Sequence, residues 1–345
     1  MIDNGEIGRG MLFEGSRKMD ITIIKVHGSN NDFYLIDEME TALSLTDEQR
    51  GQLAINMCKR TDTEGADGIL FVMNSETSDA KMRIFNSDGS EASMCGNGLR
   101  CVGRYVEEKL KKNTLEIETM KAYLQVKKEP DLYENIPTYR VEISPVIKNT
   151  SALPMNTEME EIINQRLPFI DEDLTFSTLS VPNPHLISLV DKDVIHSDRQ
   201  EKIATKLNGE NDWFTDGVNV SFVYRLEEGA IFVRTFERGV GFTNACGTAM
   251  SASSLVTKWI DHLDDEVMLR VYNPGGMVMC QVHDLEEKTW IDLIGNATYE
   301  YSTSIQVNTD TWNIKFGERK TYTDEAKAYL AFQKHIKTFV ESKMG

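Results

Sequence analysis

Short runs of β-branched and aromatic residues, separated by turn residues, dominate the chain. Such runs are typical of strands. They predict strands over residues 21–26, 33–36, 69–72, 82–85, 139–143, 220–224, 231–236 and 267–271. Clusters of turn residues at 228–229 and 273–276 follow two of these runs and indicate hairpins. The pattern therefore predicts a protein built mainly of sheet, with few helices.

A small number of segments instead place apolar residues three and four apart, the spacing of an amphipathic helix. The first begins near Gly96, the second begins near Gly247, and the third, over residues 323–340, has the pattern of a capped helix. Their apolar faces consist of Leu99, Val102, Val106 and Leu110; of Ala249, Ala252, Val256, Trp259 and Leu263; and of Tyr329, Phe332, Ile336 and Phe339. The sequence does not indicate whether the third helix covers the core or a partner subunit.

The first two helices each start directly after a cysteine, and the residues before the cysteines also match. Arg83-Ile84-Phe85-Asn86 begins twelve residues before Cys95, and Arg234-Thr235-Phe236-Glu237 begins twelve before Cys246. Each half thus has a strand, a loop, a cysteine and a helix, which indicates an internal repeat. We expect an α/β (α+β) fold of two pseudo-symmetric domains. The alternative is a chance similarity between two β-to-α turns.

The length of 345 residues agrees with two domains of about 150 residues each. Proline, asparagine and serine residues interrupt the periodic pattern between positions 144 and 156, which predicts a first domain over 19–148 and a second from 149. Residues 1–18 show no periodicity, and we expect either a disordered leader or a misassigned start codon.

The composition is that of a globular protein, with 40% hydrophobic and 27% charged residues, but the net charge of −18 is unusual. Such an acidic surface repels nucleic-acid phosphates and anionic membranes, so neither is an expected partner. The acidity itself is typical of a solvated surface. The chain has neither a run of roughly 20 apolar residues nor a signal peptide, and we expect a cytoplasmic protein.

The five cysteines are too sparse for a disulfide framework, and in a reducing compartment they should be thiols. No Cys-x-x-Cys or histidine spacing predicts a metal site. We interpret Cys58, Cys101 and Cys280 as small buried hydrophobic residues. A redox pair of Cys95 and Cys101 is disfavoured, because these residues would lie on nearly opposite faces of one helix.

A cysteine at a helix N-terminus has its thiolate stabilised by free N–H groups, so we expect lowered pKa values for Cys95 and Cys246. If the two halves face each other, the N–H groups could hold a carboxylate between two thiols. One sulfur would then remove an α-proton while the other returns a proton to the opposite face, as racemisation of an amino acid requires. The two titrations would be coupled. Since no P-loop, serine-triad or pyridoxal-lysine pattern is present, we expect catalysis without a cofactor.

Five ordered motifs over roughly residues 19–300 resemble the diaminopimelate epimerase family. They are Lys25-Val26-His27-Gly28-Ser29-Asn30-Asn31-Asp32-Phe33, the run from Arg83 to Gly98, Asn183-Pro184-His185, Gly217-Val218-Asn219-Val220, and the run from Glu237 to Thr248. Cys-Gly-Asn-Gly also differs from the related proline racemases, which carry histidine where Asn97 stands. The resemblance implies two similar domains, each a mixed sheet around a central helix. It also implies that residues 149–292 form the second epimerase domain and that 293–345 return to the first and add a C-terminal helical extension.

The resemblance further implies an isomerase that interconverts LL- and meso-diaminopimelate on the route to lysine and peptidoglycan, with an amino-acid substrate and a homodimeric assembly. By position, Cys95 and Cys246 resemble the acid and base, and His185 and Glu237 the groups that tune their pKa values. The groups that resemble the family's donors to the reacting carboxylate are Gly96, Asn97, Gly247 and Thr248. The groups that resemble its contacts to the rest of the substrate are Asn31, Asn86, Asn183, Asn219, Glu237 and Arg238. A distal ammonium and carboxylate suit a glutamate, an arginine fork and amides.

The chain departs from the family pattern at Asn30, where glycine is usual, at Phe242, where glutamate is usual, at Asn296, where proline is common, and at Gly68, where some members have glutamine. Phe242 removes a charge from the loop before Cys246. An alternative is therefore a racemase of another amino acid, such as histidine. A non-catalytic amino-acid-binding protein is a further alternative, against which the presence of both cysteines argues.

Overall fold

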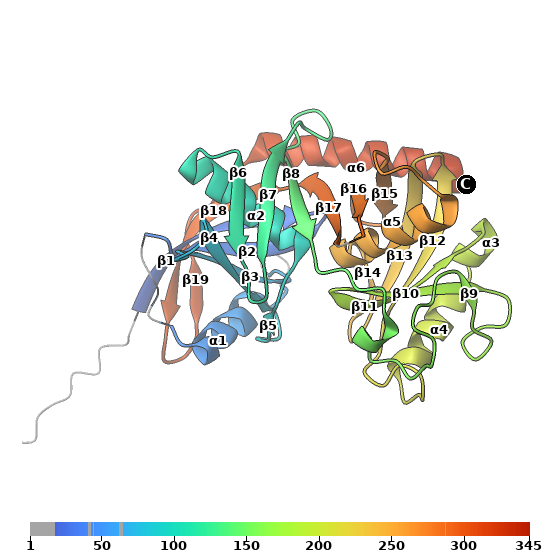
Figure 1. Ribbon diagram of the computed structural model, residues 1–345. Coiled ribbons are helices and arrows are strands. Elements are labelled where there is room, and N and C mark those ends of the chain that lie inside the picture. The colour runs from blue at the N-terminus through green and yellow to red at the C-terminus, as the bar shows by residue number, and fades with distance from the viewer. Residues whose placement is uncertain (1–17, 41–42, 44, 62–64, 287) are drawn as a thin grey trace, which may run out of the picture.

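The computed structural model describes residues 18–40, 43, 45–61, 65–286 and 288–345 (Figure 1). The predicted leader lies outside the described residues, apart from Lys18, which begins the first strand. No helix in these ranges is long and apolar enough to cross a membrane.

The first half of the chain forms a mixed sheet with two helices. β1 pairs antiparallel with β2, β2 parallel with β3, and β3 antiparallel with β4. β4 then pairs antiparallel with β5 and parallel with β6, and β6, β7 and β8 follow as antiparallel neighbours. The elements are β1 (Lys18–Gly28), β2 (Asn31–Asp37), α1 (Asp47–Met57), β3 (Gly68–Met73), β4 (Ala80–Asn86), β5 (Glu91–Ala92), α2 (Gly96–Leu110), β6 (Thr114–Glu118), β7 (Tyr123–Glu129) and β8 (Thr138–Ile143).

The second half repeats this pairing order. β10 pairs antiparallel with β11, β11 parallel with β12, β12 antiparallel with β13, and β13 both antiparallel with β14 and parallel with β15. β15, β16 and β17 then follow as antiparallel neighbours. The elements are a 3-10 turn (Thr150–Ala152), β9 (Gln165–Arg166), β10 (Thr175–Val181), β11 (Asn183–Leu189), α3 (Lys192–Ile195), α4 (Arg199–Asn208), β12 (Asn219–Glu227), β13 (Ala230–Glu237), β14 (Gly241–Thr243), α5 (Gly247–Asp261), β15 (Met268–Asn273), β16 (Gly276–Asp284) and β17 (Thr289–Asn296). The predicted pseudo-symmetric α+β fold is confirmed.

A strand pairing joins the halves into one sheet, and the strand after it returns to the first half. β8 pairs antiparallel with β17, and β18 (Thr298–Asn308) returns to pair antiparallel with β1. Two short strands, β19 (Ile314–Phe316) and β20 (Lys320–Thr321), extend the sheet beside β18. The predicted boundary between residues 292 and 293 falls inside β17, and the division at 148 and 292 stays a prediction.

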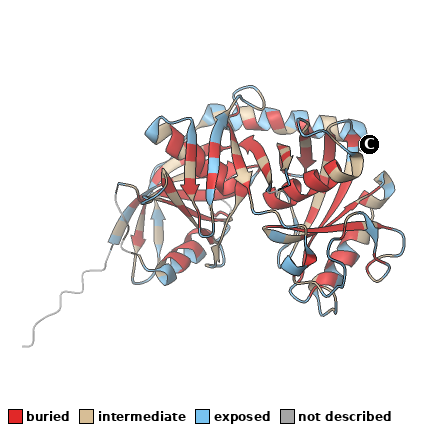
Figure 2. Ribbon diagram, viewed as in Figure 1, coloured by how far each residue is buried: buried red, intermediate tan, exposed pale blue. Residues whose placement is uncertain are grey.

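Helices α2 and α5 form the centre of the molecule. Strands surround each of them, and both ribbons are buried along most of their length (Figure 2). One continuous apolar cluster contains Leu99 and Val102 of α2 together with Ala252 and Val256 of α5. Because this shared core holds both helices, their N-termini are fixed relative to each other.

The C-terminal helix α6 (Thr323–Met344) runs along both halves (Figure 1). It is longer than the predicted 323–340, and the predicted cap was wrong: Thr323 is already helical, and no side chain caps the first turn. Helix formation starts without a cap because packing stabilises this helix, through the buried side chains of Tyr329, Phe332 and Ile336.

Ion pairs hold α6 at both ends. Arg104 of α2 donates two hydrogen bonds to the Glu325 carboxylate, at 2.6 and 2.8 Å. Near the other end, Lys343 lies 2.7 Å from the carboxylate of Glu227 on β12. The helix therefore covers the core of this chain and connects its two halves.

Candidate active site

A cleft of about 600 Å³ lies at the junction of the two halves. Its walls come from both halves: the loops before α2 and α5, the ends of β4 and β13, and the start of β11. It is lined by Asn30, Asn31, Arg60, Asp67, Asn86, Ser87, Asp88, Met94, Cys95, Gly96, Asn97, Asn183, Glu237, Val240, Phe242, Thr243, Asn244, Ala245, Cys246, Gly247 and Thr248.

The N-termini of α2 and α5 meet at the base of this cleft. A Cβ atom on Gly247 would lie 3.9 Å from the Cα atom of Gly96. Cβ atoms on Gly96 and Gly247 would lie 2.9 and 3.0 Å from the same Leu293 methyl group. The two glycines therefore allow the helix ends to approach over Leu293, and the preceding residues, Cys95 and Cys246, both line the cleft.

Cys95 is half-buried and makes hydrogen bonds of two kinds. Its sulfur accepts from the backbone N–H of Gly98 at 3.4 Å, which caps α2, and the thiol donates to Oδ1 of Asn31 at 3.5 Å. Burial raises the pKa of the Cys95 thiol, and the N–H groups of Gly98 and Asn97 only partly oppose this shift.

Cys246 lies beside a carboxylate group. Its sulfur lies 3.4 Å from the hydroxyl of Thr248, and the carboxylate of Glu237, which accepts a hydrogen bond from Thr243, is its charged neighbour. Burial raises the pKa of Cys246 well above the ordinary value, and the negative charge of Glu237 adds to the increase. The prediction of lowered thiol pKa values was therefore wrong, because desolvation outweighs the helix N-terminus at both cysteines.

The chain matches the family model described as diaminopimelate epimerase over residues 23–135 and 177–300. The chain belongs to the diaminopimelate epimerase family. Its membership makes it an isomerase.

Curated relatives agree with this assignment, and solved structures share the fold. The proteins named diaminopimelate epimerase from Listeria welshimeri and Enterococcus faecalis are 54% and 44% identical, over 90% and 94% of this chain and 98% and 99% of their own. A phenazine biosynthesis protein of the PhzF family from Bacillus anthracis has a TM-score of 0.60 at 19% identity, over 83% of this chain and 99% of its own. A hydroxyproline epimerase from Agrobacterium vitis has a TM-score of 0.55 at 12% identity, over 84% and 92%. The two solved structures show the shared fold.

Most residues chosen by resemblance to the family line the cleft, but Asn219 and Arg238 do not. Oδ1 of Asn219 accepts a hydrogen bond from the backbone N–H of Arg238 at 2.8 Å. The exposed guanidinium of Arg238 instead donates to the backbone carbonyl and carboxylate of Asp216, at 2.7 and 2.5 Å.

His185 lies on β11 and is also absent from the cleft lining. It is fully buried in the sheet, and burial lowers its pKa to about 3, which keeps the ring neutral. The structure thus places one of the two predicted tuning residues, Glu237, beside a cysteine and leaves the other inside the sheet. The remaining cysteines, Cys58, Cys101 and Cys280, are buried thiols outside the cleft.

Two of the four departures from the family pattern, Asn30 and Gly68, have structural explanations. Asn30 has a φ angle of 62°, in the left-handed region where glycine is favoured and asparagine is tolerated. A Cβ atom on Gly68 would lie 2.5 Å from the carbonyl oxygen of Phe85, so the close approach of β4 leaves no room for a glutamine. Phe242 is 45% exposed in the cleft wall, where it packs edge-on against Phe236.

Sequence reasoning missed several polar residues of the cleft, namely Arg60, Asp67, Asp88 and Asn244. Asp88 lies in a quoted motif and Asn244 stands two residues before Cys246, so their positions were an available signal. No motif or spacing in the sequence pointed to Arg60 or Asp67. Within the described ranges, no group of three or more histidine, cysteine, aspartate or glutamate side chains could hold a metal ion.

Proposed function

We propose that this enzyme interconverts LL- and meso-diaminopimelate by proton transfer at Cα, with Cys95 and Cys246 as the two acid–base groups. The observation that carries the proposal is the arrangement of two thiols at two converging helix N-termini in one cleft. The reaction would supply the biosynthesis of lysine and peptidoglycan, as in the family it belongs to.

The helix N-termini supply the carboxylate site of the proposal. The N–H groups of Gly96, Asn97, Gly247 and Thr248 have no carbonyl partner within their own helices and carry the positive end of the helix dipoles. A carboxylate bound there leaves its α-carbon between the two sulfurs. One cysteine, as thiolate, takes the α-proton, and the electron pair of the broken C–H bond is delocalised into the carboxylate. The other thiol then gives its proton to the opposite face.

Because burial raises the pKa of both thiols, a neighbouring base would favour formation of the thiolate. Glu237 faces Cys246, and we propose its carboxylate as the base that accepts the proton of this thiol. His185 is fully buried and absent from the cleft lining, and its role in tuning the pKa values of the cysteines stays a prediction from the family resemblance.

The rest of the substrate would contact the polar walls of the cleft. Amide groups of Asn31, Asn86 and Asn183 line it, and each can donate and accept hydrogen bonds. Arg238 would need to leave Asp216 to reach the cleft; an exposed ion pair of this kind contributes only about 0–1 kcal/mol, so the exchange costs little.

The reaction is tested by incubating the enzyme with LL-diaminopimelate in deuterium oxide. We expect α-deuterium in the recovered amino acid by mass spectrometry and meso product by chiral chromatography. A lack of both deuterium and meso product would show that the proposed substrate is wrong.

The two-thiol mechanism is tested by Cys95→Ala and Cys246→Ala. Each should reduce epimerisation by several orders of magnitude, because a one-sided site cannot return the proton to the opposite face. Cys101→Ala is the matched control. Cys101 lies on α2, the helix that begins directly after Cys95, but it is buried outside the cleft. Near-native turnover of either active-site variant would exclude the mechanism.

A racemase of another amino acid is the second candidate, and Phe242 is the observation that favours it. Its exposed ring places an apolar wall in the cleft where the family usually has a carboxylate. A panel of single amino acids in the same deuterium assay distinguishes the two candidates. No exchange with any of them would favour a non-catalytic amino-acid-binding protein.

We infer a cytoplasmic enzyme from its five free cysteines, which are typical of a reducing compartment. A homodimer stays a prediction from the family resemblance.

A further inference from the structure

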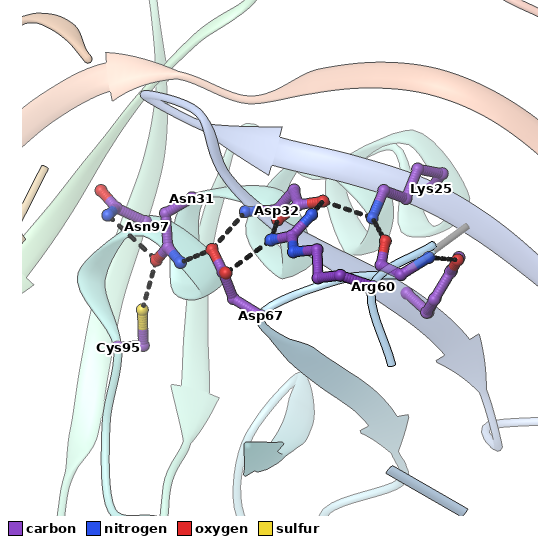
Figure 3. A network of polar contacts seen from close by, with 9 residues as sticks. Lys25, Asn31, Asp32, Arg60, Asp67, Cys95 and Asn97 are labelled. Carbon is purple, nitrogen blue, oxygen red and sulfur yellow. Dashed lines mark hydrogen bonds and ion pairs between the residues drawn. The ribbon is translucent and has the colours of Figure 1, made fainter. Parts of the chain in front are cut away.

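A network of polar side chains extends from Cys95 towards β1 (Figure 3). The Cys95 thiol donates to Oδ1 of Asn31, and Nδ2 of Asn97 donates to the same oxygen at 3.2 Å. On its other side, Nδ2 of Asn31 donates to the Asp67 carboxylate at 2.6 Å. The amide of Asn31 therefore connects the sulfur to a charged group.

Charged groups at both ends determine how the two asparagine amides are turned. A carboxylate only accepts and a guanidinium only donates hydrogen bonds. The Asp67 carboxylate thus requires the NH₂ group of Asn31 to face it. At the other end, the buried guanidinium of Arg100 donates to Oδ1 of Asn97 at 2.9 Å, so the NH₂ group of Asn97 must face Asn31. Both constraints leave the Asn31 oxygen facing Cys95.

The Asp67 carboxylate is itself held in place. One oxygen accepts from Arg60 at 2.6 Å, and the other accepts from the backbone N–H of Asp32 at 3.1 Å. Arg60 also donates two hydrogen bonds to the Asp32 carboxylate, at 3.0 and 2.6 Å, and Lys25 pairs with the same carboxylate. Although burial opposes it, the hydrogen bonds from Arg60 and Lys25 lower the pKa of Asp32. The Asp32 carboxylate, which shares Arg60 with Asp67, therefore stays charged at neutral pH.

We propose that Asp67 is a positioning residue for Cys95: it fixes the Asn31 amide with its oxygen towards the sulfur and thereby favours the protonated thiol. An amide oxygen accepts the S–H hydrogen bond but stabilises no thiolate. An NH₂ group in the same place would stabilise the thiolate instead. The inference rests on the proposed function, in which Cys95 is one of the two acid–base groups.

Asp67→Asn tests the proposal, because an amide at position 67 no longer requires the NH₂ group of Asn31 to face it. The hydrogen bond from Asn97, which Arg100 holds in place, then remains as a constraint on how the Asn31 amide is turned. The readout is the pH dependence of alkylation of each cysteine by iodoacetamide, followed by peptide mass spectrometry without substrate. At pH values below the midpoint of the Cys95 alkylation profile, we expect the rate of Cys95 alkylation to rise about fivefold. This is the effect of a change in one hydrogen bond. The Cys246 profile should not change.

Loss of a negative charge also favours a thiolate, so two comparisons separate charge from orientation. Asp88→Asn is the matched control: it removes the same charge from the cleft wall, but Asp88 bonds only to Ser90 in the described structure. Asn31→Ala removes the acceptor and should raise Cys95 alkylation by itself. In the Asn31→Ala variant, the additional change Asp67→Asn should raise the alkylation of Cys95 by no more than Asp88→Asn raises it in the native chain.

The proposal is overturned if Asn31→Ala leaves the Cys95 profile unchanged, or if Asp67→Asn has the same effect with and without Asn31. Unfolding would be recognised by alkylation of the buried cysteines Cys58, Cys101 and Cys280. In that case the Asn31→Ala profile alone decides. Since alkylation is measured without substrate, a failure of the proposed epimerase reaction would appear only in the deuterium assay.

Discussion

Replacing Tyr329 by phenylalanine and by alanine should separate two contributions of α6 to the fold. The Tyr329 hydroxyl donates to the backbone carbonyl of Gly275 at 3.2 Å. Tyr329 is 4% exposed, and its ring lies edge-on to His27, with 4.4 Å between centroids. Gly275 in turn contacts the cleft, because its carbonyl also accepts from Asn30 at 3.1 Å and its N–H donates to the Asn244 carbonyl at 2.8 Å.

The magnitudes follow from these contacts. Tyr329→Phe removes one hydrogen bond from a carbonyl that keeps a second donor in Asn30, so the free energy of unfolding should fall by about 1 kcal/mol. Tyr329→Ala also empties a buried aromatic site, for which losses of about 3–5 kcal/mol are typical. The ring should therefore account for most of the total loss in the free energy of unfolding.

Urea denaturation followed by circular dichroism measures both variants, with an unchanged m-value as the condition for comparing them. The deuterium assay adds a second readout: Tyr329→Ala should lower kcat/KM, since the turn at Gly275 supports Asn30 and Asn244 in the cleft wall. Equal destabilisation by the two variants would refute the reasoning, because the hydroxyl would then carry the whole effect.

The remaining predictions concern acid stability and the α6 ion pair. Burial lowers the pKa of His27 to about 4 from 6.5, so its contribution is fully present above pH 6.5 and is lost as the pH falls towards 4, because the unfolded chain binds a proton that the folded chain excludes. This shift corresponds to about 3 kcal/mol. Between pH 6.5 and 4.5, urea denaturation should show a smaller loss in the free energy of unfolding for His27→Asn than for the native chain. An equal loss in both proteins would contradict the prediction. Arg104→Ala leaves the largely buried Glu325 carboxylate without its bidentate partner and should cost about 3–5 kcal/mol in the same assay, whereas the double variant Arg104→Met, Glu325→Met should recover most of it. If the double variant were no more stable than Arg104→Ala, the unpaired carboxylate would not be the cause.

Much of the local architecture could be predicted from the sequence. The strands at Ile69 and Ile231 were recognisable because β-branched residues cluster there between turn residues. Other strands were missed because β-branched and aromatic residues do not cluster in them: β7 has only a short alternation of buried Leu124 and Val126 with exposed residues, and β10 buries serine and threonine between its apolar residues. The serines and threonines of β10 separate its apolar residues, Phe176, Leu179 and Val181, so that no apolar cluster marks the strand.

The sequence by itself determined the two cysteines and the repeat that relates them. Equal spacing from Arg83 to Cys95 and from Arg234 to Cys246 is a property of the chain, and so are the small residues that let two helices start beside each other. These are local features, and local chemistry accounts for them.

Only the tertiary structure decided how the cysteines are surrounded. Their pKa values depend on how much water the two halves exclude, and burial reverses the lowering expected from the helix ends. The strand pairing of β11 places His185 inside the sheet, while Asp67, which has no sequence motif of its own, lies 2.6 Å from Asn31. Desolvation and hydrogen-bond partners depend on residues that are distant in the chain, and the fold alone brings these residues together.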